Sequence, residues 1–322
     1  MTLAGALALV LGGLVVLALG GDVLVRGATS LARIAGLTPA VIGLTVVALG
    51  TSLPELVVSV IASIDKQPDL AVGNVVGSNI FNITFILGVS ALVATLPIRG
   101  NVVKFEWPVM FGATVAAILA AGDGLIDRVE AGVALMALVS FTSYSVYVAR
   151  TEATEQERAG LAEAAERKSI RAKGIELSLA VAAVLAGVGL LVAGGKALVD
   201  GAVRLAQLAG MSERVIGLTI VAAGTSAPEI ATSVMAAIRK QSDIAVANLI
   251  GSNIFNLLGI LGVAGLILPL SVSPAMRASD LWWMAGTALL VFGLMVARRS
   301  LSRPDGLILL AAYGVYLYGL LR

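Results

Sequence analysis

The 322-residue sequence contains no cysteine and no histidine, and only 13% of its residues are Asp, Glu, Lys or Arg. Without cysteine the chain can form neither disulfides nor thiolate metal sites, and without histidine it has no imidazole ligand, base or proton relay. The net charge of +2 is too small and too scattered to indicate a nucleic-acid partner. A metal ion bound by this chain must therefore be held by oxygen atoms.

Apolar residues are abundant, at 58% of the sequence with a mean hydropathy of +0.99, which indicates an integral membrane protein in contact with the lipid bilayer. A helix of about 20 apolar residues crosses a hydrocarbon core of about 30 Å, and the short alternating segments typical of membrane β-barrels are absent. We interpret the first apolar stretch as a retained span, because no basic residue precedes it. The sequence predicts an all-α protein with ten transmembrane helices, near 3–33, 41–64, 69–97, 105–122, 124–149, 175–207, 215–238, 243–270, 279–297 and 305–321.

Residues 41–88 and 215–262 are near copies, with 31 of 48 positions identical and no gap. A polar, charged linker at 150–174 separates a first five-helix repeat at 1–149 from a second at 175–322. Because an odd number of spans separates each element from its copy, the second copy enters the membrane from the opposite side. We therefore expect two inverted repeats, an arrangement found in many secondary transporters.

The distribution of basic residues predicts the orientation of the chain in a cell membrane. With the N-terminus outside, the inner loops hold fourteen Lys and Arg residues and the outer side holds five. Basic residues concentrate in cytoplasmic loops. We expect both termini outside and the central linker in the cytoplasm.

Each copy contains a proline and a glutamate in an otherwise apolar segment, as GTSLPE ending at Glu55 and GTSAPE ending at Glu229. Proline interrupts a helix and frees backbone carbonyls, which membrane proteins tolerate where the backbone lines a cavity. A buried acid at membrane depth normally marks an ion or substrate path. Further oxygens are expected beside the two carboxylates from the carbonyls of Ala48 and Ala222 and the hydroxyls of Thr51, Ser52, Thr225 and Ser226.

A second motif, GSNIFN, begins at Gly77 and again at Gly251. Its serine and last asparagine are four residues apart and share one helix face, which predicts further ligands at Ser78, Asn82, Ser252 and Asn256. The glycines Gly73, Gly77 and Gly251 suit close helix packing. Asn79 and Asn253 could bond between helices or contact an ion.

Two carboxylates together with hydroxyl, amide and carbonyl oxygens form a hard-oxygen site that suits Ca²⁺ or Na⁺. Bare negative charges are costly in a poorly solvated place, and one divalent or two monovalent cations would neutralise them. A loaded site would then cross an apolar barrier more easily than an empty one, which is the physical basis of exchange without leak.

The paired segments GTSLPE...GNVVGSN and GTSAPE...ANLIGSN resemble the alpha repeats of the cation/calcium exchanger superfamily, in particular its prokaryotic sodium/calcium exchanger branch. The resemblance covers nearly the whole chain. It implies an antiporter in which Na⁺ and Ca²⁺ compete for central sites, with the first and sixth spans sliding against the other eight. It also implies Glu55 and Glu229 as shared main ligands, surrounded by the hydroxyl and carbonyl oxygens named above.

Departures from the family pattern bear on the coupling ion. Asn82 and Asn256 stand where potassium-dependent relatives carry an acid, and Gly77 stands where proton-coupled relatives carry one. The two amides argue against a K⁺ requirement, whereas Gly77, with Gly251 in the copy, favours Na⁺ over H⁺ as the driving ion. The alternative is an H⁺/Ca²⁺ antiporter, or one for another divalent cation. A passive channel and an intramembrane hydrolase fit less well. We expect no enzymatic activity and no cofactor, and a functional monomer.

Charged residues also lie in the first and sixth spans, as Asp22 with Arg26 and Lys196 with Asp200. Each pair is spaced four apart, which predicts local ion pairs. A second hypothesis is that these pairs gate the sliding helices.

Overall fold

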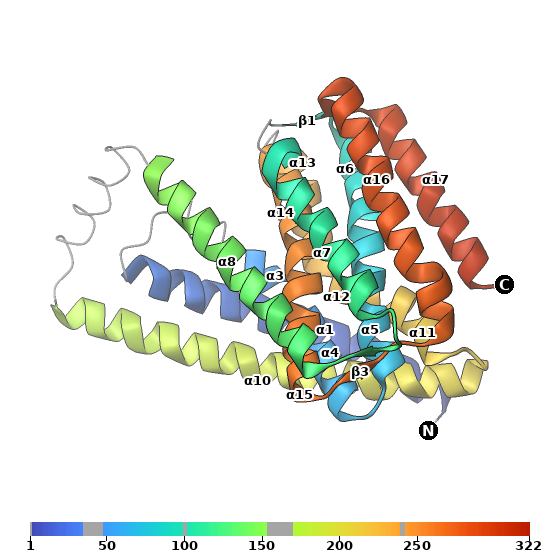
Figure 1. The fold of residues 1–322 in the computed structure, drawn as a ribbon. Helices are drawn as coiled ribbons and strands as arrows, with labels where there is room; N and C mark the ends of the chain where they lie inside the picture. The colour runs from blue at the N-terminus through green and yellow to red at the C-terminus, as the bar shows by residue number, and fades with distance from the viewer. Residues whose placement is uncertain (1, 35–47, 99–101, 153–169, 239–241) are drawn as a thin grey trace.

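The computed structural model describes residues 2–34, 48–98, 102–152, 170–238 and 242–322. The described part is helical apart from four strands of two residues each (Figure 1). In the first half the elements are α1 (Leu3–Ile34), α3 (Ala48–Thr51), α4 (Leu53–Ile64), α5 (Pro68–Phe81), η2 (Asn82–Ile86), α6 (Leu87–Val93), β1 (Leu96–Pro97), η3 (Val102–Glu106), α7 (Trp107–Ala120), β2 (Leu125–Ile126) and α8 (Arg128–Glu152). In the second half they are α10 (Ile170–Ala209), α11 (Glu213–Ile216), η4 (Gly217–Val221), α12 (Ala222–Thr225), α13 (Ala227–Ile238), α14 (Ser242–Ile254), η5 (Phe255–Ile260), α15 (Leu261–Ile267), β3 (Leu270–Ser271), η6 (Met276–Asp280), α16 (Leu281–Arg298), β4 (Ser300–Leu301) and α17 (Arg303–Leu320).

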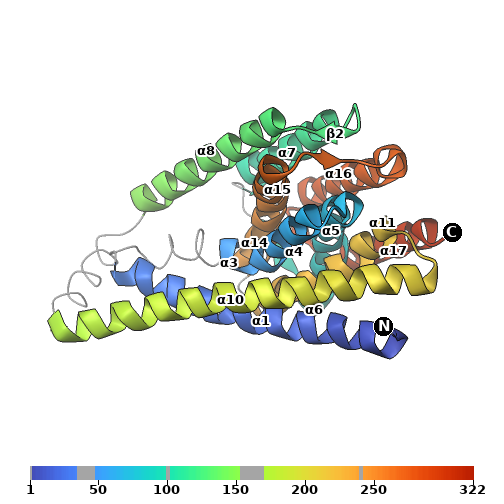
Figure 2. The ribbon, with the colours of Figure 1, turned by 90° about the horizontal axis from the view of Figure 1, so that it is seen from below.

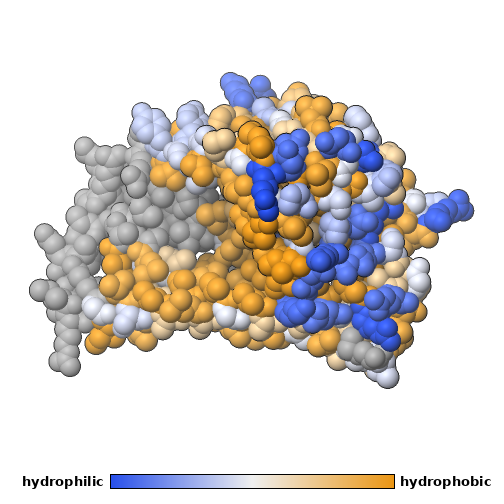
Figure 3. Space-filling view, turned by 60° about the horizontal axis from the view of Figure 1, so that its bottom comes forward, coloured by the Kyte–Doolittle hydropathy of each residue, from blue (hydrophilic) through white to orange (hydrophobic). Residues whose placement is uncertain are grey.

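Among the described residues, seven helices are long and apolar enough to cross a membrane, and an eighth span results if the bent pair Glu213–Thr225 and Ala227–Ile238 is counted as one. Ten spans were expected. The expected span at 41–64 begins outside the described residues, and α17, which begins with Arg303, Pro304 and Asp305, is not among the seven. Large apolar side chains are exposed along α1 and α10, and much of the surface in Figure 3 is apolar, as contact with lipid requires.

The secondary structure repeats as the sequence does. The helices α4 and α13, the helices α6 and α15, the strands β1 and β3, and the π-helical turns η3 and η6 begin and end at corresponding residues of the two halves. Strand β1 pairs with β4, and β2 pairs with β3. Each of the two strand pairs therefore joins one half of the chain to the other.

The two longest helices, α1 and α10, lie side by side along one face of the other helices (Figures 1 and 2). Glycines let their backbones touch. A Cβ atom added at Gly13 would lie 2.7 Å from the backbone nitrogen of Leu198, and one added at Gly194 would lie 2.8 Å from that of Leu17. Small residues of this kind drive close helix association in lipid, so α1 and α10 form one tightly packed pair.

The spans that carry the two motifs lie inside the protein. The stretches Pro68–Val93 and Ala245–Ile267 are the most buried of the seven span candidates. Each contains a π-helical turn at the end of the GSNIFN motif, with η2 beginning at Asn82 and η5 beginning at Phe255. Such turns occur often at functional sites, and here they fall at the asparagines that the sequence singles out.

Candidate cation-binding site

The predicted break beside each proline is confirmed. Helix α3 ends at Thr51 and α4 begins at Leu53, so that Ser52 separates two helical pieces, and Pro54 lies in the first turn of α4. In the second half Ser226 separates α12 from α13, and the two parts of that span meet at 49°. Proline is tolerated in a first turn because the backbone donors there have no helical partner. Glutamate in the same turn is favoured by the helix dipole.

Both glutamates are buried, with Glu55 0% and Glu229 1% exposed. The Ser226 hydroxyl donates to Glu55 Oε1 at 2.9 Å, and the Ser52 hydroxyl donates to Glu229 Oε1 at 3.1 Å. Each carboxylate is therefore bonded to the helix break of the opposite half. The two acids face a common centre, as the two-fold relation of the copies requires.

The second oxygen of each carboxylate has no partner. Glu55 Oε2 and Glu229 Oε2 are fully buried, and no described residue forms a hydrogen bond with either. A buried anionic oxygen without a partner is costly. The arrangement lacks a positive charge at this point, and a bound cation would supply it.

The GSNIFN serines also reach the centre. The Ser252 hydroxyl donates to Glu229 Oε1 at 3.4 Å, and the Ser78 hydroxyl approaches the Ala222 carbonyl at 3.5 Å. Thr51 and Thr225 are buried beside the breaks. Every expected hydroxyl therefore lies buried at or beside the two carboxylates.

The prediction that proline frees the Ala222 carbonyl is wrong. The Ala222 carbonyl accepts from the Ser226 backbone at 3.1 Å and from the Thr225 hydroxyl at 3.3 Å, so proline does not leave it unpaired. The reason is that Pro228 lies two residues beyond Ser226, whose own N–H continues the helical pattern. Ala48, whose carbonyl is the other predicted ligand, is the first residue of α3.

The asparagines form bonds between the halves. Asn82 Nδ2 donates to Asn253 Oδ1 at 3.0 Å, and Asn253 Nδ2 donates to the Asn79 carbonyl at 3.2 Å. Asn256 is 1% exposed, and neither its Oδ1 nor its Nδ2 has a partner among the described residues. Asn82 Oδ1 is also unpartnered within this part of the chain. Asn82 and Asn253 thus bond between helices, whereas the Asn79 side chain donates within its own helix to the Val75 carbonyl at 2.8 Å. Asn79, Asn82 and Asn256 each have a side-chain oxygen without a partner among the described residues.

Sequence reasoning missed Asn74, which is fully buried and joins the halves. Its Nδ2 donates to the Glu55 carbonyl at 3.2 Å and to the Ser59 hydroxyl at 2.9 Å, while its Oδ1 accepts from the Thr225 hydroxyl at 3.1 Å. The sequence does contain a sign that Asn74 matters, because the second copy has an asparagine, Asn248, at the same place. Asn248 donates to the Ser233 hydroxyl at 3.3 Å.

Replacing Asn74 with alanine should destabilise the folded protein by about 1–3 kcal/mol, because it leaves buried polar groups without partners. Thermal unfolding in detergent would measure the loss. Asn248→Ala is the matched control and should cost less, since Asn248 forms one hydrogen bond within the described residues. Equal losses for the two variants would contradict a bridging role for Asn74.

The glycines of the second motif differ in what they face. A Cβ at Gly73 would lie 3.3 Å from the Arg214 carbonyl, and one at Gly77 would lie 2.7 Å from the Leu218 carbonyl. Close packing is therefore confirmed for these two. No described residue lies within 4 Å of a Cβ added at Gly251, and Leu44, the counterpart of Leu218, falls outside the described residues.

The charged residues of α1 and α10 form the local pairs that their spacing predicts. Arg26 contacts Asp22 at 2.9 Å, and Lys196 contacts Asp200 at 2.9 Å. Lys196 also contacts Asp65 at 2.6 Å, which links α10 to the end of α4. These side chains are at least one-third exposed except that of Asp65, at 32%. Ion pairs this exposed contribute little to stability, and a gating role stays a hypothesis.

Acid side chains alone do not complete a metal site. Within the described ranges, no three Asp, Glu, His or Cys side chains lie together in a way that could hold a metal ion. Hydroxyl, amide and carbonyl oxygens must supply the remaining ligands, as Ca²⁺ and Na⁺ accept. The centre between the two helix breaks offers such oxygens.

Comparisons with known proteins agree with this chemistry. A sequence profile described as "Sodium/calcium exchanger protein" matches residues 5–149 and 179–322. The chain is 37% identical over 312 residues to a protein named putative antiporter CaxA from Alkalimonas amylolytica, covering 96% of each chain. It is 31% identical over 340 residues to the sodium/calcium exchanger MaX1 of Methanosarcina acetivorans, covering 95% of each.

Among solved structures, the sodium-calcium exchanger NCX_Mj soaked with 100 mM Na⁺ and 10 mM Sr²⁺ matches with a TM-score of 0.68 at 28% identity, covering 98% of this chain and 99% of the other. The family match spans both halves and leaves out the polar linker between them. From its sequence, its fold and its paired buried acids, this chain belongs to the sodium/calcium exchanger protein family.

Proposed function

We propose that this protein exchanges Na⁺ for Ca²⁺ across the membrane by alternating access to one central site. Membership of the family supports cation/Ca²⁺ antiport and a transporter rather than an enzyme. One observation carries the proposal, namely that Glu55 and Glu229 each have one oxygen bonded across the two-fold centre and one buried oxygen without a partner among the described residues. Cations bound there in turn would satisfy these oxygens.

The proposed ligands are those that the sequence singles out. Glu55 and Glu229 supply the charge, and neutral oxygens complete the shell. Buried position and closeness to the carboxylates support the hydroxyls, and unpartnered oxygens support the two asparagines. The neutral set comprises Thr51, Ser52, Ser78, Thr225, Ser226, Ser252, the carbonyls of Ala48 and Ala222, Asn82 and Asn256. No cofactor is needed for this function.

The architecture proposed for this function has ten transmembrane helices in two inverted repeats, 1–149 and 175–322, joined by a cytoplasmic linker at 150–174. The matched elements of the halves and the exchanged strand pairs β1–β4 and β2–β3 support the repeat. The excess of basic residues in the expected inner loops supports external termini. Since both carboxylates lie within one chain, a monomer contains the complete site.

Tracer Ca²⁺ uptake into proteoliposomes tests the proposal. Vesicles loaded with Na⁺ and diluted into Na⁺-free medium should accumulate Ca²⁺, whereas vesicles given only a pH gradient should not. Uptake that follows the pH gradient would replace Na⁺ with H⁺ as the driving ion. Uptake that needs neither gradient would indicate a passive channel and would contradict exchange.

A further inference from the structure

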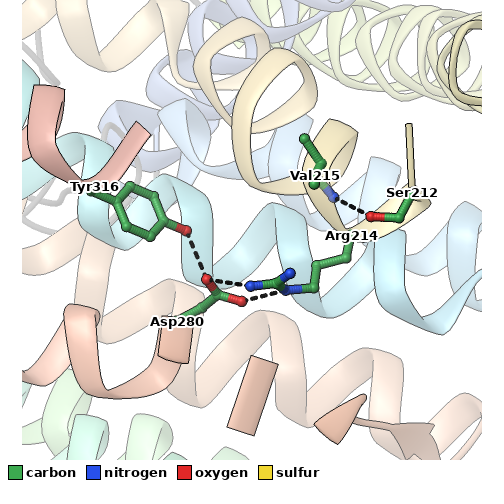
Figure 4. Close-up of polar contacts among 5 residues, drawn as sticks. All are labelled: Ser212, Arg214, Val215, Asp280 and Tyr316. Atoms are coloured by element: carbon green, nitrogen blue, oxygen red, sulfur yellow. Dashed lines mark hydrogen bonds and ion pairs between the residues drawn. The ribbon is translucent and has the colours of Figure 1, made fainter. Parts of the chain in front are cut away.

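A buried ion pair joins the broken span of the second half to the two C-terminal helices (Figure 4). Arg214, in α11, donates from Nε to Asp280 Oδ2 at 2.6 Å and from Nη2 to Asp280 Oδ1 at 3.0 Å. Tyr316 of α17 donates from its hydroxyl to the same Oδ1 at 3.3 Å. Asp280 is the last residue of η6, directly before α16. Three elements therefore meet at one carboxylate.

This cluster is more buried than the ion pairs of α1 and α10 described above. The side chain of Asp280 is 1% exposed and that of Arg214 is 18% exposed. A buried pair gains little net stability, because removing two charges from water offsets most of their attraction. A two-point contact between guanidinium and carboxylate does fix geometry, since both planes must match. The pair therefore fixes where α11 lies relative to Asp280 rather than adding much stability.

The ion pair holds the segment Glu213–Thr225 in place, and this segment carries some of the proposed cation ligands. This segment packs against α5, where an added Cβ at Gly73 would lie 3.3 Å from the Arg214 carbonyl and Ser78 approaches the Ala222 carbonyl at 3.5 Å. A shift of the segment along α5 would separate Ser78 from Ala222. Arg214 lies at the start of the segment, and Thr225 lies at its end.

A turn directly before the segment separates it from α10. Helix α10 ends at Ala209, and Gly210 follows in the left-handed region with φ of +64°. Ser212 has extended backbone and accepts from the Val215 backbone at 3.3 Å, which begins a new helix (Figure 4). The new helix therefore starts independently of α10, and Arg214 lies within its first turn.

The cluster is not repeated in the first half. The residues that correspond to Arg214, Asp280 and Tyr316 are Ala40, Glu106 and Phe141. Without an arginine or a tyrosine at these places, the first copy cannot form the same three-residue contact. The two halves of the cation site are therefore supported differently.

We propose that Arg214, Asp280 and Tyr316 are positioning residues that hold the second-half ligand segment, and thereby Ala222, Thr225 and Ser226, in the place required for tight Ca²⁺ binding. This proposal rests on the proposed function, because it assigns these residues to the affinity of the same site. The hydrogen bonds described for these three side chains go to one another and not to Glu55 or Glu229. Their loss should weaken binding without stopping turnover.

The test uses full-length Asp280→Asn in proteoliposomes, with Arg277→Gln as the matched control. Arg277 also belongs to η6 but bonds to the Gly122 carbonyl at 2.9 Å, away from α11. We expect Asp280→Asn to raise the half-saturating Ca²⁺ concentration about tenfold and to leave the maximal rate per folded protein within about twofold of wild type. Arg277→Gln should show the wild-type half-saturating concentration. Equilibrium binding of ⁴⁵Ca²⁺ in detergent should show the same affinity change.

Two further variants keep the test decisive if Asp280→Asn does not fold. Tyr316→Phe removes one hydrogen bond and should raise the half-saturating concentration by about twofold to threefold. Asp280→Glu retains the charge and should lie closer to wild type than the asparagine variant.

An unchanged half-saturating concentration in the folded variants, with only yield or maximal rate reduced, would overturn the positioning role. Wild-type protein that binds ⁴⁵Ca²⁺ but shows no Na⁺-driven uptake would instead contradict the proposed function, and the binding assay would still decide the role of Asp280.

Discussion

Replacement of Glu55 by glutamine should abolish Na⁺-driven Ca²⁺ uptake in proteoliposomes while leaving the protein folded. Glutamine has nearly the same shape, and its carbonyl oxygen can still accept from Ser226, whose hydroxyl donates to Glu55 Oε1 at 2.9 Å. The variant loses the negative charge, and an amide nitrogen takes the place of Oε2, the carboxylate oxygen that has no partner among the described residues. A buried cation then faces one carboxylate instead of two.

The expected loss is large. At an effective dielectric constant of about 20, two unit charges about 4 Å apart attract by about 4 kcal/mol, and about 1.4 kcal/mol corresponds to a factor of about ten in a dissociation constant. Ca²⁺ affinity should therefore fall by about a thousandfold or more. Glu229→Gln should behave alike, because Glu229 is buried and bonded in the same way.

A carboxylate outside the centre provides the control. Glu130 lies in the first turn of α8 and accepts from the Asp127 backbone at 2.9 Å. Glu130→Gln should transport at the wild-type rate. Uptake in Glu55→Gln that matches wild type would contradict the assignment of the site, provided that both variants elute as folded protein in detergent.

The features that the sequence predicted correctly depend on local chemistry. Proline two residues after Ser52 and Ser226 requires an interruption, and both interruptions are present. Near copies of the glutamate segment predict similar surroundings for the two acids, and each carboxylate accepts from a serine of the other copy. These are consequences of backbone geometry and symmetry, which a single sequence contains.

What the sequence could not predict depends on tertiary packing. Arg214 and Asp280 are 66 residues apart, and no repeat pattern relates them because the first copy has Ala40 in place of the arginine. The Ala222 carbonyl was expected to be free, yet the N–H of Ser226, the residue that caps α12, donates to it.

Gly77→Ala should disrupt the protein more than its small size suggests. The added Cβ would lie 2.7 Å from both the Cα and the carbonyl oxygen of Leu218, and 2.8 Å from the Ala222 Cβ. Two of these three atoms belong to backbone, which cannot rotate away as a long side chain could. Overpacking of this kind typically costs about 1–3 kcal/mol and shifts the backbone.

The shift would act on the cation site directly. Helix α5 carries Gly77 and, one residue later, Ser78, whose hydroxyl approaches the Ala222 carbonyl at 3.5 Å. Pushing α5 away from η4 separates these two proposed ligands, so both the unfolding temperature and the Ca²⁺ affinity should fall. Thermal unfolding in detergent and Ca²⁺ uptake per folded protein measure the two effects.

Gly293 on α16 is the matched control, since no described residue lies within 4 Å of a Cβ added there. Gly293→Ala should retain wild-type transport and gain slightly in stability, because alanine is favoured over glycine in a helix by about 1 kcal/mol. If Gly77→Ala unfolds and transports like Gly293→Ala, then the contact between α5 and η4 yields easily and does not set the position of Ala222. If only Gly77→Ala loses affinity, the spacing between these two elements determines how tightly the cation is held.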